Sequence, residues 1–189
     1  MDFAVRRADD MSIAHALHFL AWIGVIDRNP ERVVSAFEEA SRRSLGRFPL
    51  YEALTTMLWG WARAELGEPD EGVAEMTAAL EAMEATGAWM VHSYLLALLA
   101  EAERRAGRPA EALATVGRAF EFAEQRDERF YLPDLHRLRG ELIYELFPDR
   151  RAEAIEEIEK GVALARAQGN KGLEQRAAET LRTASALRS

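Results

Sequence analysis

The chain has 189 residues, 49% of them hydrophobic and 30% charged, a composition that indicates a soluble globular protein and not a disordered or membrane-spanning one. Its net charge of −8 argues against a nucleic-acid-binding module, because such a module needs a basic face to meet phosphate. The chain contains no cysteine, which excludes disulfides and thiolate metal sites and is compatible with the cytoplasmic location that we predict.

Proline and glycine divide the chain into helical segments. The six prolines suit loops or first helical turns, where a missing N–H leaves no carbonyl unpaired, and Gly67 and Gly107 suit helix ends. The apolar run 13–26 is expected to be a buried first helix rather than a signal peptide, because His15 and His18 interrupt it. We predict helices over residues 11–27, 30–44, 50–66, 69–85, 89–106, 109–125, 133–146, 150–168 and 171–187.

Small residues recur along these helices at a nearly constant interval. Gly60, Ala100 and Gly140 are 40 residues apart, and Ala21 lies 39 residues before Gly60. The helices that follow show the same spacing in a second series, Val33, Gly72, Ala112 and Ala154. Small residues at fixed places in a helix pair indicate that two backbones approach closely there, and the repeat predicts a helical solenoid.

Each pair of helices resembles a tetratricopeptide repeat (TPR), with a small residue in the first helix, a Gly-x-Pro turn and small residues in the second. The segments 59–72 and 99–112 carry this resemblance best, although their period of about 40 residues exceeds the usual 34. We therefore predict an all-α, right-handed α-solenoid in one domain, 1–189, with repeats at about 11–46, 50–87, 89–128 and 133–169. A capping helix at 171–187 would close it, or begin a truncated fifth repeat.

The longer units also resemble the C-terminal repeat region of large bacterial ATP-dependent regulators, including ATPases fused to nucleotide cyclase domains. The matching segments are 14–22, 58–62, 96–102 and 135–142. The resemblance implies that catalysis belongs to other domains of such proteins. Two departures stand out: Arg28 replaces a helix-ending glycine, and His136 and Arg139 replace bulky apolar residues of the neighbouring units.

In such a solenoid the first helices of successive units line a concave groove, and one stripe of each helix faces it. The candidate groove residues are His15, His18, Trp22, Leu54, Met57, Trp61, Tyr94, Glu101, Arg104, Arg137, Glu141 and Tyr144. Exposed aromatic rings on a rigid concave face are typical anchors for a peptide. The alternative is that Trp22 and Trp61 are core residues.

Other signals are weaker. His15 and His18 lack an obvious third ligand, so we predict no metal site. The charged groove residues are expected to form cross-repeat ion pairs or to hold a charged ligand, and Glu153, Glu156, Glu157 and Glu159 are expected to form a solvated face. No phosphate loop, HExxH, GxSxG or cysteine nucleophile is present, so we predict neither enzymatic activity nor a cofactor.

We therefore predict a non-catalytic scaffold that binds a segment of a partner protein in its groove, within a bacterial signalling or transcription-regulatory system. Two alternatives stay open. One is a small-ligand sensor module of a larger ATP-dependent regulator, and the other is an oligomerisation module that would form a homodimer. We expect no direct contact with nucleic acid or membrane.

Overall fold

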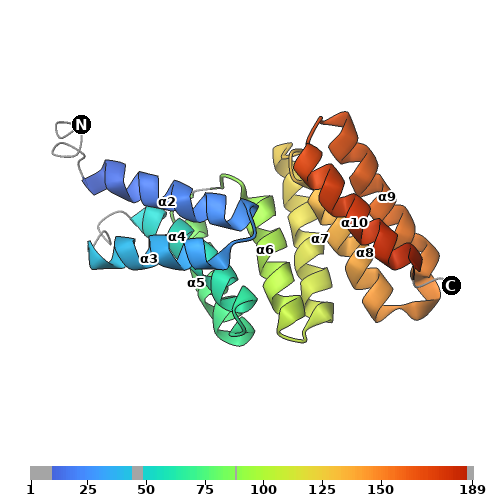
Figure 1. The fold of residues 1–189 in the computed structure, drawn as a ribbon, viewed down its shortest axis with the longest axis horizontal. Helices are drawn as coiled ribbons and strands as arrows, with labels where there is room; N and C mark the ends of the chain where they lie inside the picture. Colours follow the sequence, from blue (N-terminus) through green and yellow to red (C-terminus); the bar gives the residue numbers. More distant parts are fainter. Residues whose placement is uncertain (1–9, 44–48, 88, 187–189) are drawn as a thin grey trace. The chain divides into compact units, whose positions relative to one another are not determined.

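The computed structural model describes residues 10–43, 49–87 and 89–186 (Figure 1). The chain divides into two compact units, Met1–Met90 and Val91–Ser189, and each is described by itself below. The described residues form α-helices and one short 3₁₀-helix without any strand, which confirms the all-α class. The predicted helix ends at 44 and 187 and the repeat boundary at 46 lie outside the described residues.

The first unit contains two helical hairpins. They are formed by α2 (Asp10–Ile26) with α3 (Pro30–Arg42) and by α4 (Pro49–Glu65) with α5 (Pro69–Ala85). Both α2 and α3 also contact α4, so the two hairpins share one core. Met57, Leu58 and Trp61 of α4 lie at the centre of this core with Met76 of α5.

The second unit contains two hairpins and one further helix. They are formed by α6 (His92–Arg105), α7 (Pro109–Arg126), α8 (Leu132–Leu146), the 3₁₀-helix η1 (Pro148–Arg150), α9 (Arg151–Ala167) and α10 (Lys171–Ala186). Helix α6 pairs with α7 and α8 with α9, while α10 packs against both α8 and α9 (Figure 1). Helices α6 and α8 also contact each other. Among the described helices, none combines the length and apolar character that a bilayer crossing requires.

Proline begins most of these helices as predicted. Pro30, Pro69, Pro109 and Pro133 lie in first helical turns, where their fixed φ suits the helix and their missing N–H breaks no hydrogen bond. Helix α6 differs from the prediction, because it begins at His92 and not at residue 89. Val91 has a left-handed backbone, with φ 54°, and this conformation separates the preceding turn from the helix.

The turns within the hairpins α2–α3, α4–α5 and α6–α7 each use a residue in the left-handed conformation, whereas α8 and α9 are joined through η1. Gly67 and Gly107 have φ values of 102° and 73°, as their helix-ending role predicts. Arg28 takes the same kind of conformation, with φ 55°, at the equivalent place in the first hairpin. The turn geometry is thus kept where the glycine is missing, and the arginine side chain lies over the ring of Trp61, 5.5 Å from its centroid.

The recurring small residues lie where helices of a hairpin approach most closely. A Cβ atom placed on Gly60 would lie 2.7 Å from the carbonyl oxygen of Gly72, across the α4–α5 contact. A Cβ atom on Gly140 would lie 2.6 Å from the carbonyl oxygen of Ala154, across the α8–α9 contact. These two pairs are members of the two predicted series, so the close-packing role assigned to them from the sequence is confirmed.

His136 and Arg139, the two polar residues found where the neighbouring repeats have bulky apolar ones, both pair with a buried carboxylate. Glu157 of α9 accepts hydrogen bonds from His136 at 2.9 Å and Lys160 at 2.7 Å, and it pairs with Arg139 at 2.6 Å. Burial raises the pKa of Glu157, but hydrogen bonds from Arg139, Lys160 and His136 outweigh it and lower the pKa to about 2. The prediction that Glu157 belongs to a solvated face was therefore wrong, whereas Glu153, Glu156 and Glu159 are exposed.

The close contact at Gly140 can be tested by adding one methyl group. We expect Gly140→Ala to lower the free energy of unfolding by about 1–3 kcal/mol, because the new Cβ would collide with Ile158 and the backbone of Ala154. Gly117→Ala in α7 is the matched control, since no atom lies within 4 Å of its added Cβ. Alanine's higher helix propensity should make the control neutral or stabilising by up to about 1 kcal/mol in urea denaturation. Equal effects of both variants would contradict the assigned packing.

Candidate functional site

Helices α6 and α8 of the second unit meet at the buried guanidinium group of Arg137. Its Nε donates to Asp134 at 2.7 Å, its Nη1 to Glu141 at 2.8 Å and its Nη2 to Glu101 of α6 at 2.8 Å. Asp134, Arg137 and Glu141 lie three and four residues apart on α8, so the helix itself places them on one face. Only 4% of the Arg137 side chain is exposed, so all three nitrogen atoms rely on protein carboxylates.

Two further arginines extend this group of charges. Arg176 of α10 donates to Asp134 at 3.0 Å and also to Glu101, and Arg104 of α6 donates to Glu141 and Glu145, each at 2.7 Å. We call these side chains the arginine–carboxylate network: Glu101, Arg104, Asp134, Arg137, Glu141, Glu145 and Arg176. The network connects α6, α8 and α10 through their side chains. Arg176 of α10 reaches Glu101 of α6, although the two residues are 75 positions apart in the sequence.

The charges of the network compensate one another. Burial lowers the pKa of Arg137, but Asp134, Glu141 and Glu101 together raise it well above its usual range, so the guanidinium stays charged. A buried charge is tolerated only when its partners supply both opposite charge and hydrogen bonds, and Arg137 has both.

A pocket of about 810 Å³ lies beside the network. We call it the charged pocket, and it is lined by Arg104, Arg137, Glu141, Tyr144, Glu145, Pro148, Arg151, Ile158, Arg176, Glu179, Thr180, Thr183 and Ala184. Its volume falls within the range of sites that hold drug-sized ligands, about 300–1,000 Å³. The lining combines four arginines and three glutamates with hydroxyl and aliphatic groups, which suits a ligand with both charged and apolar parts.

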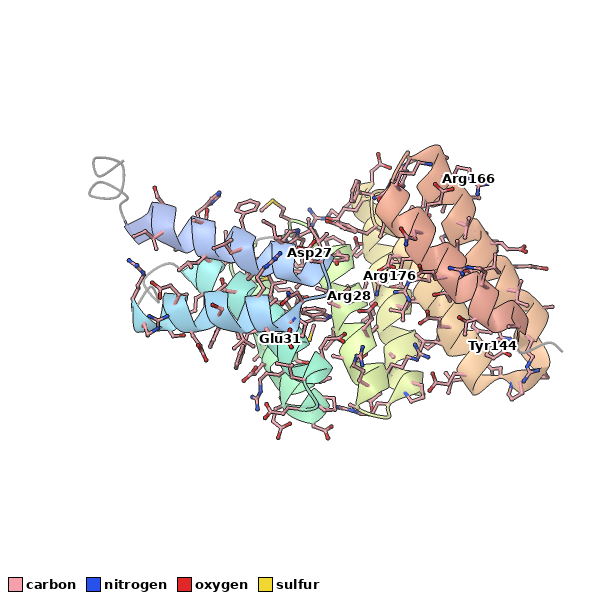
Figure 2. All side chains as sticks on the ribbon, in the orientation of Figure 1. Asp27, Arg28, Glu31, Tyr144, Arg166 and Arg176 are labelled. Carbon is pink, nitrogen blue, oxygen red and sulfur yellow. The ribbon has the colours of Figure 1, made fainter. Side chains whose placement is uncertain are left out.

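Side-chain pairing shows how the pocket runs along α8 and α10. Arg176 pairs with Asp134 near the start of α8, and Thr180, one turn further along α10, donates to Glu141 at 2.8 Å. Both helices therefore proceed in the same sense, from the network toward Tyr144 on α8 and Thr183 on α10. Figure 2 labels Arg176 and Tyr144, which mark these two regions of the pocket.

The structure brings together five of the residues selected from the sequence. Glu101, Arg104, Arg137 and Glu141 belong to the network, and all but Glu101 line the charged pocket together with Tyr144. Tyr94 lies apart from them, buried and stacked on Tyr131 with 4.2 Å between ring centroids. The prediction of cross-repeat ion pairs among the charged residues is confirmed for α6 and α8.

Sequence reasoning missed Arg176 and Thr180, since it treated the last helix as a cap. The repeat period contains the signal that would have found them: Arg176 lies 39 residues after Arg137, and Thr180 lies 39 residues after Glu141. Helix α10 packs against α8, and its Arg176 and Thr180 occupy the positions that the first helix of a fifth repeat would give them. The alternative that α10 begins a truncated repeat accounts for these positions better than a polar cap does.

In the first unit, the predicted groove residues of α4 belong to the core. Leu54 and Met57 are buried, and only 1% of Trp61 is exposed. Of the two alternatives for Trp61, the structure agrees with the core residue and not with the exposed groove ring, because α4 is covered by α2, α3 and α5. Whether these residues contact a partner stays a prediction, but their place in the structure is that of core side chains.

The predicted residues of α2 form an aromatic cluster with Tyr51 of α4. Nδ1 of His15 lies 2.6 Å from the Tyr51 hydroxyl, and the His18 ring lies 6.0 Å from the rings of both Trp22 and Tyr51. His18 is buried, and its Nδ1 has no hydrogen-bond partner among the described residues. Burial, with a smaller contribution from His15, lowers the pKa of His18 to about 4. Within the described part of the chain, no three His, Asp or Glu side chains group closely enough to hold a metal ion.

Helix α2 is less buried than its sequence suggested. Phe19, Leu20, Ile23 and Ile26 are all exposed, although the apolar run 13–26 predicted a buried helix. The reason is that α2 packs against α3 and α4 on one side, so apolar residues around the rest of its circumference face outward.

A comparison with solved structures is consistent with this architecture. The structure of RapI in its apo form is similar, with a TM-score of 0.56 and 18% sequence identity over 94% of this chain and 69% of the RapI chain. At this identity the likeness shows the fold alone, and it supports the TPR-like helical fold predicted from the repeats. No family model matches the chain, and no curated protein matches its sequence.

The structural importance of Arg137 can be measured directly. We expect Arg137→Met to lower the free energy of unfolding by about 3–5 kcal/mol, because it leaves Asp134, Glu101 and Glu141 without their shared counter-ion. Arg129→Met is the control, since the Arg129 side chain is 78% exposed in its pair with Asp127 and should change stability by less than about 1 kcal/mol. Urea denaturation followed by circular dichroism gives both values. A loss of less than about 1 kcal/mol for Arg137→Met would contradict the role assigned to the network.

The buried His18 should make the first unit less stable in mild acid. Its pKa is about 4 in the folded protein and about 6.5 in the unfolded chain, so only the unfolded chain gains its proton as the pH falls below 6.5. We expect this to remove about 1 kcal/mol of stability between pH 7.5 and 5.5. The stability of His18→Leu should depend less on pH by that amount, whereas His15→Gln should keep most of the dependence, because burial is the larger cause. Identical pH profiles for wild type and His18→Leu, measured by urea denaturation, would disprove the assignment.

Proposed function

We propose that this protein is a non-catalytic binding module that holds a segment of a partner protein in the charged pocket. The observation that carries the proposal is the pocket of about 810 Å³ between α8, α9 and α10, with Arg104 of α6 at its edge. Arginine and tyrosine line it, and these residue types supply much of the binding energy at protein interfaces.

The surroundings of the pocket favour a preformed site. Arg104, Arg137 and Arg176 are each held by two or more carboxylates, so their side chains are already ordered before a partner arrives. Ordering side chains costs about 0.5–1.5 kcal/mol each when it occurs on binding, and this cost is avoided here. The stripe of first-helix residues predicted to bind a partner contributes Arg104, Arg137, Glu141 and Tyr144 to the same pocket.

We further propose that the four repeats of this chain form a right-handed solenoid. We also propose that the protein works in the bacterial cytoplasm, within a signalling or transcription-regulatory system. The support is the resemblance of its repeats to those of large ATP-dependent regulators. Catalysis would then belong to other proteins or domains, in keeping with the lack of phosphate-loop, HExxH, GxSxG and cysteine nucleophile motifs in the sequence.

A second candidate function is the sensing of a small ligand, and the size of the charged pocket favours it. A metabolite that binds only the folded protein would raise its melting temperature, so a thermal-shift screen tests this candidate.

The proposed function is tested by filling the pocket. Peptides would be selected from a random displayed library on the wild-type protein, and their affinities measured by fluorescence anisotropy. We expect Thr183→Trp, which adds an indole at the pocket wall, to weaken binding about tenfold or more, equivalent to about 1.4 kcal/mol. Gln175→Trp, on the same helix and outside the pocket lining, should bind normally. Equal binding by both variants, with their helical content unchanged, would rule out the pocket as the site.

A further inference from the structure

Arg151 differs from the other arginines of the charged pocket. Arg104, Arg137 and Arg176 each pair with at least two carboxylates, but Arg151 makes no ion pair with any described residue. Its guanidinium lies over the ring of Tyr144, 5.1 Å from the centroid, and its side chain is exposed at the pocket. The Tyr144 ring thus fixes the position of the Arg151 guanidinium, but no carboxylate among the described residues neutralises its charge.

The neighbours of Arg151 suit a carboxylate. Contact with the face of Tyr144 holds the guanidinium in place while its N–H groups stay available for an acceptor. The Tyr144 hydroxyl is itself buried and has no hydrogen-bond partner among the described residues, so the part of Tyr144 that bears on this argument is the ring beneath Arg151. Arginine binds carboxylates through two parallel hydrogen bonds, which gives both strength and orientation.

The acidic residues of the pocket restrict where such a carboxylate can bind. Glu141 and Glu145 are paired with Arg104. Among the described residues, Glu179 accepts a hydrogen bond from the neutral amide of Gln175 at 3.2 Å and forms an ion pair with Arg182 at 3.8 Å, so its negative charge is less compensated and would repel an anion at its own part of the wall. Pro148, Ile158 and Ala184 complete the lining with apolar surface. A matching ligand therefore carries one acidic group for Arg151, with aliphatic surface beside it.

We propose that the charged pocket recognises an acidic segment of a partner protein, in which an Asp or Glu side chain pairs directly with Arg151. This inference rests on the proposed function, since it names the chemistry of the segment that the pocket would hold. It assigns specificity to Arg151, while the arginine–carboxylate network behind it maintains the shape of the pocket.

The test uses peptides selected from a random displayed library on the wild-type protein. We expect these peptides to be enriched in Asp and Glu, and their affinity to fall with ionic strength because the contact is between opposite charges. Arg151→Gln should weaken their binding about tenfold. Arg150→Gln is the matched control, with the same change in net charge at the adjacent position; Arg150 pairs with Glu153 outside the pocket lining, so binding should stay within about twofold.

The outcomes separate this inference from the proposed function. If Thr183→Trp abolishes binding but the peptides are not acidic, or bind Arg151→Gln as well as wild type, the pocket is a binding site and the inference is wrong. If Thr183→Trp has no effect, the proposed function fails as well. Circular dichroism and melting temperatures of each variant establish that a loss of binding does not come from unfolding.

Discussion

The second unit depends on one buried charge. Arg137 offers three nitrogen atoms to three carboxylates on α6 and α8, and two of those carboxylates, Asp134 and Glu101, also accept from Arg176 of α10. Removing Arg137 would leave these three buried or half-buried carboxylates with only Arg176 and Arg104 as counter-ions, which costs far more than loss of an exposed pair. Ion pairs as well as apolar packing therefore fix how α6, α8 and α10 are placed along one another. This placement in turn determines the shape of the charged pocket.

Helix α8 presents different polar groups to α9 and to the helices α6 and α10. Toward α9, Gly140 permits close backbone contact while Glu157 gathers His136, Arg139 and Lys160 around one buried carboxylate. Toward α6 and α10, the same helix presents the arginine–carboxylate network and then the pocket. Polar groups that are fully paired specify one arrangement of their helices, since any other arrangement leaves a charge buried without a partner.

The first unit shows a different balance. Its core is aromatic and aliphatic, with Met57 and Trp61 buried, and α2 leaves Phe19 and Ile26 exposed. From the sequence, Met57 was predicted to line a groove, Trp61 was left open between groove and core, and Phe19 and Ile26 were placed in a buried helix. The structure places Met57 and Trp61 in the core and leaves Phe19 and Ile26 exposed. Helix α2 has apolar residues around its whole circumference and gives no periodic signal for which side packs, so sequence alone could not show that Phe19 and Ile26 are exposed.

Local chemistry and the repeat period determined much of this protein in advance. The helix starts at proline, the turns at Gly67 and Gly107 and the close contacts at Gly60 and Gly140 all follow from the backbone preferences and size of single residues. Only the tertiary structure decided which charged side chains share a partner and which residues enclose a pocket. The approach of Arg176 to Glu101 joins residues 75 positions apart, and it depends on the packing of α10 against α8 and α9, which no local preference encodes.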